Sequence, residues 1–165
     1  MSKPRSERIA LRTHRPGDLG WVVHRHGALY AQEFGWDERF EGLVAGIVAK
    51  FIARFDPGLE RCWIAEMDGE PVGAVLVVKA GKATAQLRLL LIEPGVRGHG
   101  LGKRLVQECI AFAREKGYRR LVLWTQSNLT AARSLYAGCG FELKKTEKHA
   151  SFGVKLTGEY WALAL

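Results

Sequence analysis

The feature that most constrains the fold is a buried strand, a glycine-rich turn and an amphipathic helix that follow one another directly. Residues 84–93 contain the unbroken apolar run Leu89-Leu90-Leu91-Ile92, which is typical of a strand covered on both faces. Glycines then precede a helix expected over residues 101–116, and residues 121–124 form a second apolar run. A strand, a crossover helix and a second strand make a right-handed parallel unit. The chain is therefore predicted to contain a parallel strand pair.

Three further helices are predicted from their caps and apolar spacing. Asp18 is expected to cap a helix that ends near Gly35, and Asp37 one whose apolar stripe occupies residues 40–55. A short helix is expected from Asn128 to residue 137. These helices need a sheet on which to bury their apolar faces.

Further strands are predicted at residues 9–12, 61–67 and 72–79, and the chain ends in two strands, of which the last covers residues 157–165. The strands at 61–67, 72–79 and 84–93 are expected to form an antiparallel meander. The order of elements predicts a three-layer α/β/α fold around a mixed, mostly antiparallel sheet. No linker or repeat divides the chain, so residues 1–165 are expected to form one domain, with residues 1–7 flexible.

Charge and cysteine content restrict the function classes. The net charge is +8 and the sequence pI is about 9.7, which favours anionic partners in general. Basic and aromatic residues do not alternate as in nucleic-acid-binding proteins, so no specific nucleic-acid partner is expected. No apolar stretch is long enough to span a membrane, and residues 1–8 lack the apolar core of a secretory signal, so a cytoplasmic location is expected. Cys62, Cys109 and Cys139 are widely spaced, so neither a disulfide framework nor a metal site is predicted.

The glycine-rich turn is predicted to bind a phosphate group. A helix start carries unpaired N–H groups and partial positive charge, and glycines allow close backbone approach. Arg97, Lys103 and Arg104 add positive charge nearby. A Walker A loop is excluded because Arg97 replaces its first glycine and Arg104 its hydroxyl residue, and a dinucleotide loop is excluded because Lys103 replaces its third glycine.

The residues of this turn carry a resemblance to a known family. Arg97-x-x-Gly100-x-Gly102, after a strand ending in Ile92-Glu93-Pro94, resembles the acetyl-CoA signature of the GNAT superfamily of N-acetyltransferases. The segment from Leu135 to Phe141 is similar to the family's second block, in which a helix tyrosine precedes a glycine-phenylalanine turn. The resemblance covers the whole chain.

A narrower resemblance is to the acetyltransferase half of fusions with MarR-type regulators. It is carried by the tract Tyr30-Ala31-Gln32-Glu33-Phe34-Gly35-Trp36-Asp37, by residues 61–66, and by His149-x-Ser151-Phe152-Gly153 with Gly158-Glu159-x-Trp161. The DNA-binding half of those fusions has no counterpart in this sequence, so its function is not carried over.

The family resemblance implies acetyl transfer from acetyl-CoA to the primary amine of a small molecule or amino acid, with no metal. It also implies a sheet of about seven strands with a splayed parallel pair. Backbone groups of the first parallel strand would hold the pantetheine arm and polarise the thioester, and the turn would hold the pyrophosphate. The cofactor-binding residues implied in this way are Leu90, Leu91, Ile92, Arg97, Gly98, His99, Gly100, Leu101, Gly102, Lys103, Asn128, Ala132 and Tyr136.

The resemblance also suggests the catalytic residues. Tyr136 is the candidate general acid, since a phenol can donate a proton to the leaving thiolate. The family often uses a glutamate in the middle of the first parallel strand as base, and this chain has none there. Glu33 is the preferred base, with Glu93 and His149 as alternatives.

The acceptor pocket is expected to contain Tyr30, Glu33, Phe34, Trp36, Trp124 and residues 149–152, a largely aromatic set that suits a small amine with an apolar body. The missing mid-strand carboxylate leaves open an alternative function, a non-catalytic acyl-CoA-binding sensor. A homodimer is an open alternative to a monomer, because the family often pairs its sheet edges.

Overall fold

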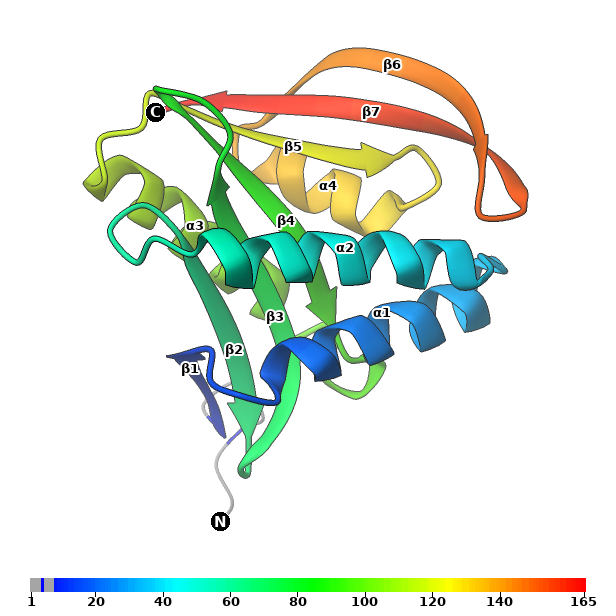
Figure 1. Ribbon diagram of the computed structural model, residues 1–165, viewed down its shortest axis with the longest axis horizontal. Coiled ribbons are helices and arrows are strands. Elements are labelled where there is room, and N and C mark those ends of the chain that lie inside the picture. Colours follow the sequence, from blue (N-terminus) through cyan, green and yellow to red (C-terminus); the bar gives the residue numbers. More distant parts are fainter. Residues whose placement is uncertain (1–3, 5–7) are drawn as a thin grey trace.

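The computed structural model describes residue 4 and residues 8–165, so the flexibility expected for residues 1–7 falls, Pro4 apart, on residues that it does not describe. One seven-stranded sheet has the order β1-β2-β3-β4-β5-β7-β6 (Figure 1). β4 and β5 pair in parallel and all other neighbouring strands pair antiparallel. The predicted mixed sheet with one parallel pair is confirmed.

The elements follow the predicted order, with a short 3-10 turn, η2, that the sequence did not predict. Their bounds are β1 Ile9–Thr13, α1 Asp18–Phe34, α2 Glu38–Arg54, β2 Arg61–Met67, β3 Glu70–Lys79, β4 Thr84–Ile92, η2 Pro94–Val96, α3 Leu101–Glu115, β5 Arg120–Gln126, α4 Thr130–Gly138, β6 Glu142–Ser151 and β7 Val154–Ala164. In the described part of the chain, no helix is long and apolar enough to cross a bilayer.

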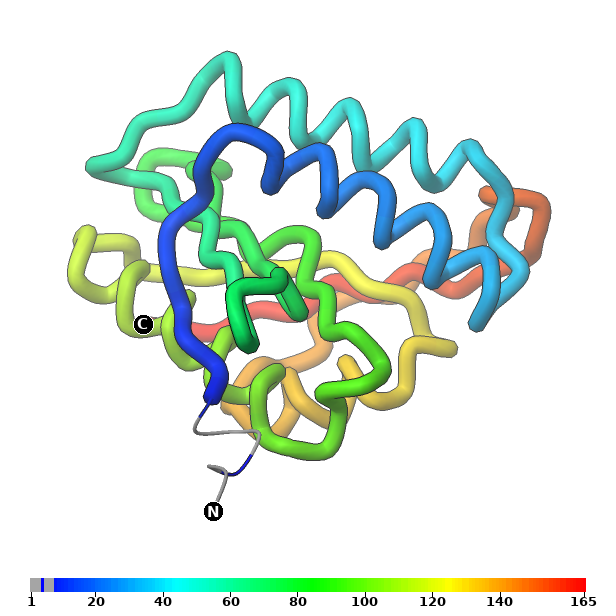
Figure 2. Tube along the Cα trace, turned by 90° about the horizontal axis from the view of Figure 1, so that it is seen from below, coloured from blue at the N-terminus to red at the C-terminus, as the bar shows by residue number. Residues whose placement is uncertain are grey.

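Helices cover both faces of the sheet, with α1 and α2 side by side on one face and α3 and α4 on the other (Figure 2). Strand alternation divides the core accordingly. In β2, Cys62 and Ile64 pack with α1 and α2, whereas Trp63 and Ala65 belong to the cluster formed with α3. The three-layer α/β/α prediction is therefore confirmed.

Three local predictions are wrong. Asn128 precedes the last helix rather than beginning it, because α4 starts at Thr130. The final strand begins at Val154, since β6 and β7 form one long hairpin. The run from Leu89 to Ile92 is not covered on both faces throughout; Leu91 is buried, but its neighbours are half-buried because they line an opening in the sheet.

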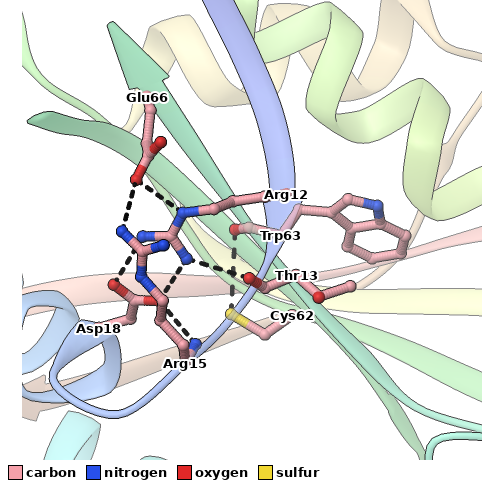
Figure 3. A network of polar contacts seen from close by, with 7 residues as sticks. All are labelled: Arg12, Thr13, Arg15, Asp18, Cys62, Trp63 and Glu66. Carbon is pink, nitrogen blue, oxygen red and sulfur yellow. Dashed lines mark hydrogen bonds and ion pairs between the residues drawn. The ribbon is translucent and has the colours of Figure 1, made fainter. Parts of the chain in front are cut away.

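Asp18 also differs from its predicted role. Gly17 occupies the cap position of α1, and the Asp18 carboxylate instead accepts hydrogen bonds from Arg12 (2.6 and 3.0 Å) and from the Arg15 backbone N–H (2.7 Å). Arg12 Nε also donates to Glu66 Oε1 at 2.6 Å (Figure 3). This network joins β1, β2 and the start of α1. The pKa of Asp18 lies below the ordinary 3.8, and the hydrogen bond from Arg12 is the largest cause.

The opening in the sheet arises where β4 leaves β5. The two strands pair only through Thr84, Ala85 and Gln86, while β5 remains paired with β7 as far as Gln126. Beyond Gln86, β4 also bulges: Leu89 and Leu90 together face Val75 of β3, and Leu89 has a φ of 56°. From Leu87 onward, backbone groups of β4 directed toward β5 therefore have no partner from that strand.

Replacing Asp18 by Asn is expected to lower the free energy of unfolding by about 2 kcal/mol near neutral pH, the scale of a hydrogen bond to a charged group. Because the native pKa of Asp18 is depressed, its contribution is fully present above about pH 4 and is lost as the pH falls through the native pKa. Urea unfolding of both proteins, near neutral pH and at about pH 3, measures the difference.

The matched control is Asp68→Asn, which removes a carboxylate whose side chain is 60% exposed and pairs with Arg8. Its expected effect is below about 0.5 kcal/mol. If Asp18→Asn were no more destabilising than this control, the Asp18 network would not contribute to stability.

Candidate functional site

A groove of about 450 Å³ runs between β4, the turn before α3 and the start of α4. It brings together most of the predicted cofactor residues: Leu90, Leu91, Ile92, Arg97, Gly98, Gly100, Leu101, Gly102, Asn128 and Ala132. His99 and Lys103 are not among its lining residues, and Tyr136 lines a neighbouring cavity instead. Leu129 and Leu135 also line the groove and were not predicted to do so; Leu135 begins the second block, and the only sequence signal for Leu129 is its proximity to the helix of that block.

The turn presents free backbone donors to this groove. Gly98 and Gly100 have φ values of 82° and 79°, which side chains rarely adopt, and a Cβ on either would meet no atom within 4 Å. Gly100 is the N-cap of α3 and supplies no side-chain cap. The N–H groups of the first turn of α3 therefore have no intrahelical acceptor. The Arg97 N–H, in contrast, donates to the Pro94 carbonyl (3.3 Å).

Two ion pairs attach α1 to this turn. Arg25 Nε lies 2.5 Å from Glu93 Oε1, and the Glu33 carboxylate lies 2.8 Å from an Arg97 guanidinium nitrogen. Arg97 Nε also donates to the Ile92 carbonyl at 3.2 Å. The pairs bracket the turn before α3, so they hold its backbone against the wall that α1 provides.

A second cavity of about 490 Å³ adjoins the groove. Its aromatic walls come from α1, the loop between α1 and α2, α2, β5 and the β6–β7 hairpin: Tyr30, Trp36, Phe40, Trp124, Phe152 and Tyr160. Ring centroids of Trp36 and Phe152 are 5.2 Å apart, and those of Trp124 and Tyr160 are 4.4 Å apart. Of the predicted acceptor residues, Tyr30, Trp36, Trp124, His149, Ser151 and Phe152 lie here.

Glu33 and Phe34 line the groove rather than this cavity. Arg88, Gln126 and Glu147 line the cavity and were not predicted to do so. The groove and the cavity meet at residues that line both, among them Tyr30, Leu90 and Ala132. The bulged end of β4 is thus accessible from both spaces.

Tyr136 lies at the wall of the cavity. The side chain is buried, with the residue 5% exposed, and its ring packs against Phe141 at 5.9 Å. Burial raises its pKa well above the ordinary value of 10, and the neighbouring Tyr30 adds to the effect. The phenol is therefore protonated at neutral pH and can act as a donor.

His149 has hydrogen-bond partners at both ring nitrogens. Nε2 lies 2.9 Å from Gln126 Oε1, and Nδ1 lies 2.9 Å from Ser151 Oγ. Because the Gln126 carbonyl oxygen accepts from Nε2–H, the neutral ring leaves Nδ1 as the acceptor of the Ser151 hydroxyl proton. All three side chains line the cavity.

His26 also lines the cavity, where burial lowers its pKa to about 4, so its ring is neutral near pH 7. Over residue 4 and residues 8–165, no group of three or more His, Cys, Asp and Glu side chains is arranged to hold a metal ion.

Residues 24–141 match the family described as the acetyltransferase (GNAT) family. The rat protein N-acetyltransferase family 8 member 2 is 41% identical over 85 residues, 48% of this chain and 38% of that protein. A mycothiol acetyltransferase of Beutenbergia cavernae is 33% identical over 104 residues, 61% of this chain and 33% of that protein. The chain thus spans two fifths or less of these relatives.

Solved structures share the fold at lower sequence identity. A putative acetyltransferase of Salmonella typhimurium, solved with its cofactor acetyl-CoA, has a TM-score of 0.75 at 20% identity. The match covers 96% of this chain and 94% of the Salmonella chain. A GNAT family acetyltransferase of Elizabethkingia anophelis with acetyl-CoA bound has a TM-score of 0.69 at 16% identity, and the match covers 96% of this chain and 99% of that one.

Proposed function

The chain belongs to the acetyltransferase (GNAT) family, and on that premise we propose that it transfers the acetyl group of acetyl-CoA to the primary amine of a small molecule or amino acid. One observation carries the proposal: the parted end of β4 and the uncapped start of α3 line the same groove. The end of β4 offers backbone groups to the amide-containing pantetheine arm, and the start of α3 offers N–H donors to the diphosphate.

The residues present fit acetyl-CoA. The N–H groups at the start of α3, with Gly98 and Gly100 before them, would hold the pyrophosphate. Asn128 and Ala132 form the facing wall, and Leu90, Leu91 and Ile92 would hold the pantetheine arm as an added strand holds a sheet edge. Lys103 and His99 lie outside the groove lining, and we assign Lys103 only a long-range attraction for phosphate.

Bound acetyl-CoA supplies an acyl thioester at the junction of groove and cavity. The chain positions an amine in the aromatic cavity for direct attack on the carbonyl, without an enzyme nucleophile. Backbone N–H groups at the β4 bulge, around Leu90, that have no partner in β5 would donate to the carbonyl oxygen as it gains negative charge.

The arriving amine must lose a proton, and two bases compete for this role. Glu33 lines the groove rather than the cavity, and its carboxylate engages Arg97, so acting as base requires this ion pair to open. His149 lines the cavity and accepts from Ser151, which also lines it. We therefore favour a relay: Ser151 Oγ takes the ammonium proton as its own hydroxyl proton passes to His149 Nδ1.

The leaving thiolate must gain a proton, and Tyr136 is the proposed donor. Its hydroxyl is protonated, and the residue belongs to the cavity that meets the groove at Leu90. Glu93 has both carboxylate oxygens engaged by Arg25, which argues for a structural role.

Replacing Tyr136 by Phe is expected to lower kcat about a hundredfold, the scale of a lost general acid, while the dissociation constant of acetyl-CoA changes little. Release of free thiol with a panel of primary amines measures kcat, and calorimetry measures binding. An unchanged kcat would remove Tyr136 from the mechanism, and absence of thiol release from the wild-type protein with every amine would contradict the proposed function.

The base is identified by the pH dependence of kcat/KM. His149→Gln is expected to lower kcat/KM about a hundredfold near neutral pH and to remove the limb over which it rises with pH. Glu33→Gln, which keeps the side-chain shape, is expected to retain that limb. If Glu33→Gln alone removed the limb, the base would be Glu33 and not the Ser151–His149 pair.

The tract from Tyr30 to Asp37 and the β6–β7 hairpin residues support a specific kinship with acetyltransferases fused to MarR-type regulators. The sheet runs continuously from β1 to β6, which supports a single domain. The exposed edge strand β6 supports a homodimer, and the free thiols of Cys62, Cys109 and Cys139 support a cytoplasmic location. No specific observation favours the non-catalytic sensor.

A further inference from the structure

Arg88 is a cation without a partner at the wall of the acceptor cavity. It lies on β4 between Gln86 and the bulge, and it lines the cavity but not the groove. Among the residues that the structure describes, no carboxylate lies within ion-pair distance of its guanidinium and no side-chain hydrogen bond engages it. The arginines beside the groove contrast with it, since Arg25 and Arg97 are each paired to a glutamate.

The position of Arg88 is costly without an anion. The side chain is half-buried, and desolvation lowers its pKa with no charged neighbour to offset the effect. Withdrawing a cation from water is unfavourable unless an anion or hydrogen-bond acceptor replaces the water. A guanidinium facing a cavity in this state is suited to a ligand that brings a negative charge.

Acetyl-CoA does not supply that charge. Its phosphates are assigned to the start of α3, in the groove, and Arg88 is absent from the groove lining. The anion must therefore belong to the second substrate, which occupies the cavity. Arg88 is the one arginine or lysine among the cavity-lining residues of the described chain. A single guanidinium binds a carboxylate through two parallel hydrogen bonds and balances its charge, whereas a phosphate dianion would keep one negative charge unbalanced.

We propose that the acceptor is an amino acid with an aromatic or large apolar side chain, and that Arg88 binds its carboxylate. The inference rests on the proposed function and adds the substrate class. Arg88 precedes Leu90, at the junction with the groove, by two residues of β4, and both residues line the cavity. The carboxylate can thus reach Arg88 while the α-amine faces the thioester, and the aromatic walls receive the side chain.

The test compares L-phenylalanine with L-phenylalaninamide, which has the same shape without the negative charge. Arg88→Met is expected to lower kcat/KM for phenylalanine about tenfold to a hundredfold, the loss of a charged bidentate contact, and to leave kcat/KM for the amide within about twofold. Arg88→Lys should lose less than Arg88→Met, since lysine keeps the positive charge but not the two parallel N–H donors of the guanidinium. Calorimetry with N-acetyl-L-phenylalanine and with its amide, both in the presence of coenzyme A, should show the same difference in binding.

Arg114→Met is the charge-matched control, because Arg114 is exposed on α3 and lines neither space. It should leave every value unchanged. Equal losses for the acid and the amide in Arg88→Met would overturn the proposal. So would a wild-type protein that binds coenzyme A but neither acetylates phenylalanine nor binds its N-acetyl product. Failure to bind coenzyme A at all would instead contradict the proposed function.

Discussion

The site depends on the parting of two parallel strands. β4 and β5 pair over only three residues, after which β5 follows β7 and β4 follows β3 (Figure 1). The backbone groups freed on β4 cannot stay buried without partners, so the opening has to admit water or a ligand with amide groups. The bulge at Leu89 turns the strand further, and it places Leu90 where groove and cavity meet.

The remaining parts of the structure hold this opening in shape. α1 carries both ion pairs to the turn before α3 and contributes Tyr30 to the junction. The network of Arg12, Asp18 and Glu66 fixes the start of that helix to β1 and β2 (Figure 3). α1 therefore contributes both to the stability of the fold and to the geometry of the site, since a shift of α1 would move a wall of the groove and a wall of the cavity together.

The sequence predicted what depends on local pattern and did not predict what depends on distant contacts. The element order, the Asp37 cap and the glycine turn follow from short-range rules. Asp18 fits the pattern of a cap, but Arg12 engages it, and Arg12 is itself held by the distant Glu66 of β2. Glu33 was expected in the acceptor pocket, yet Arg97 holds it beside the groove. No sequence motif marks Arg88, because its role follows from the lack of a carboxylate partner at the cavity wall, which is visible only in the folded structure.

The proposed function requires that backbone amides at the start of α3 bind the pyrophosphate of coenzyme A. Calorimetric titration of Gly100→Ala and Gly117→Ala tests it, because both glycines have φ near 80° with open space at Cβ, while only Gly100 lines the groove. Each variant should lose about 1 kcal/mol of stability to backbone strain, and Gly100→Ala alone should bind coenzyme A about tenfold or more weakly. Equal affinity in both variants would show that the α3 amides do not bind the pyrophosphate.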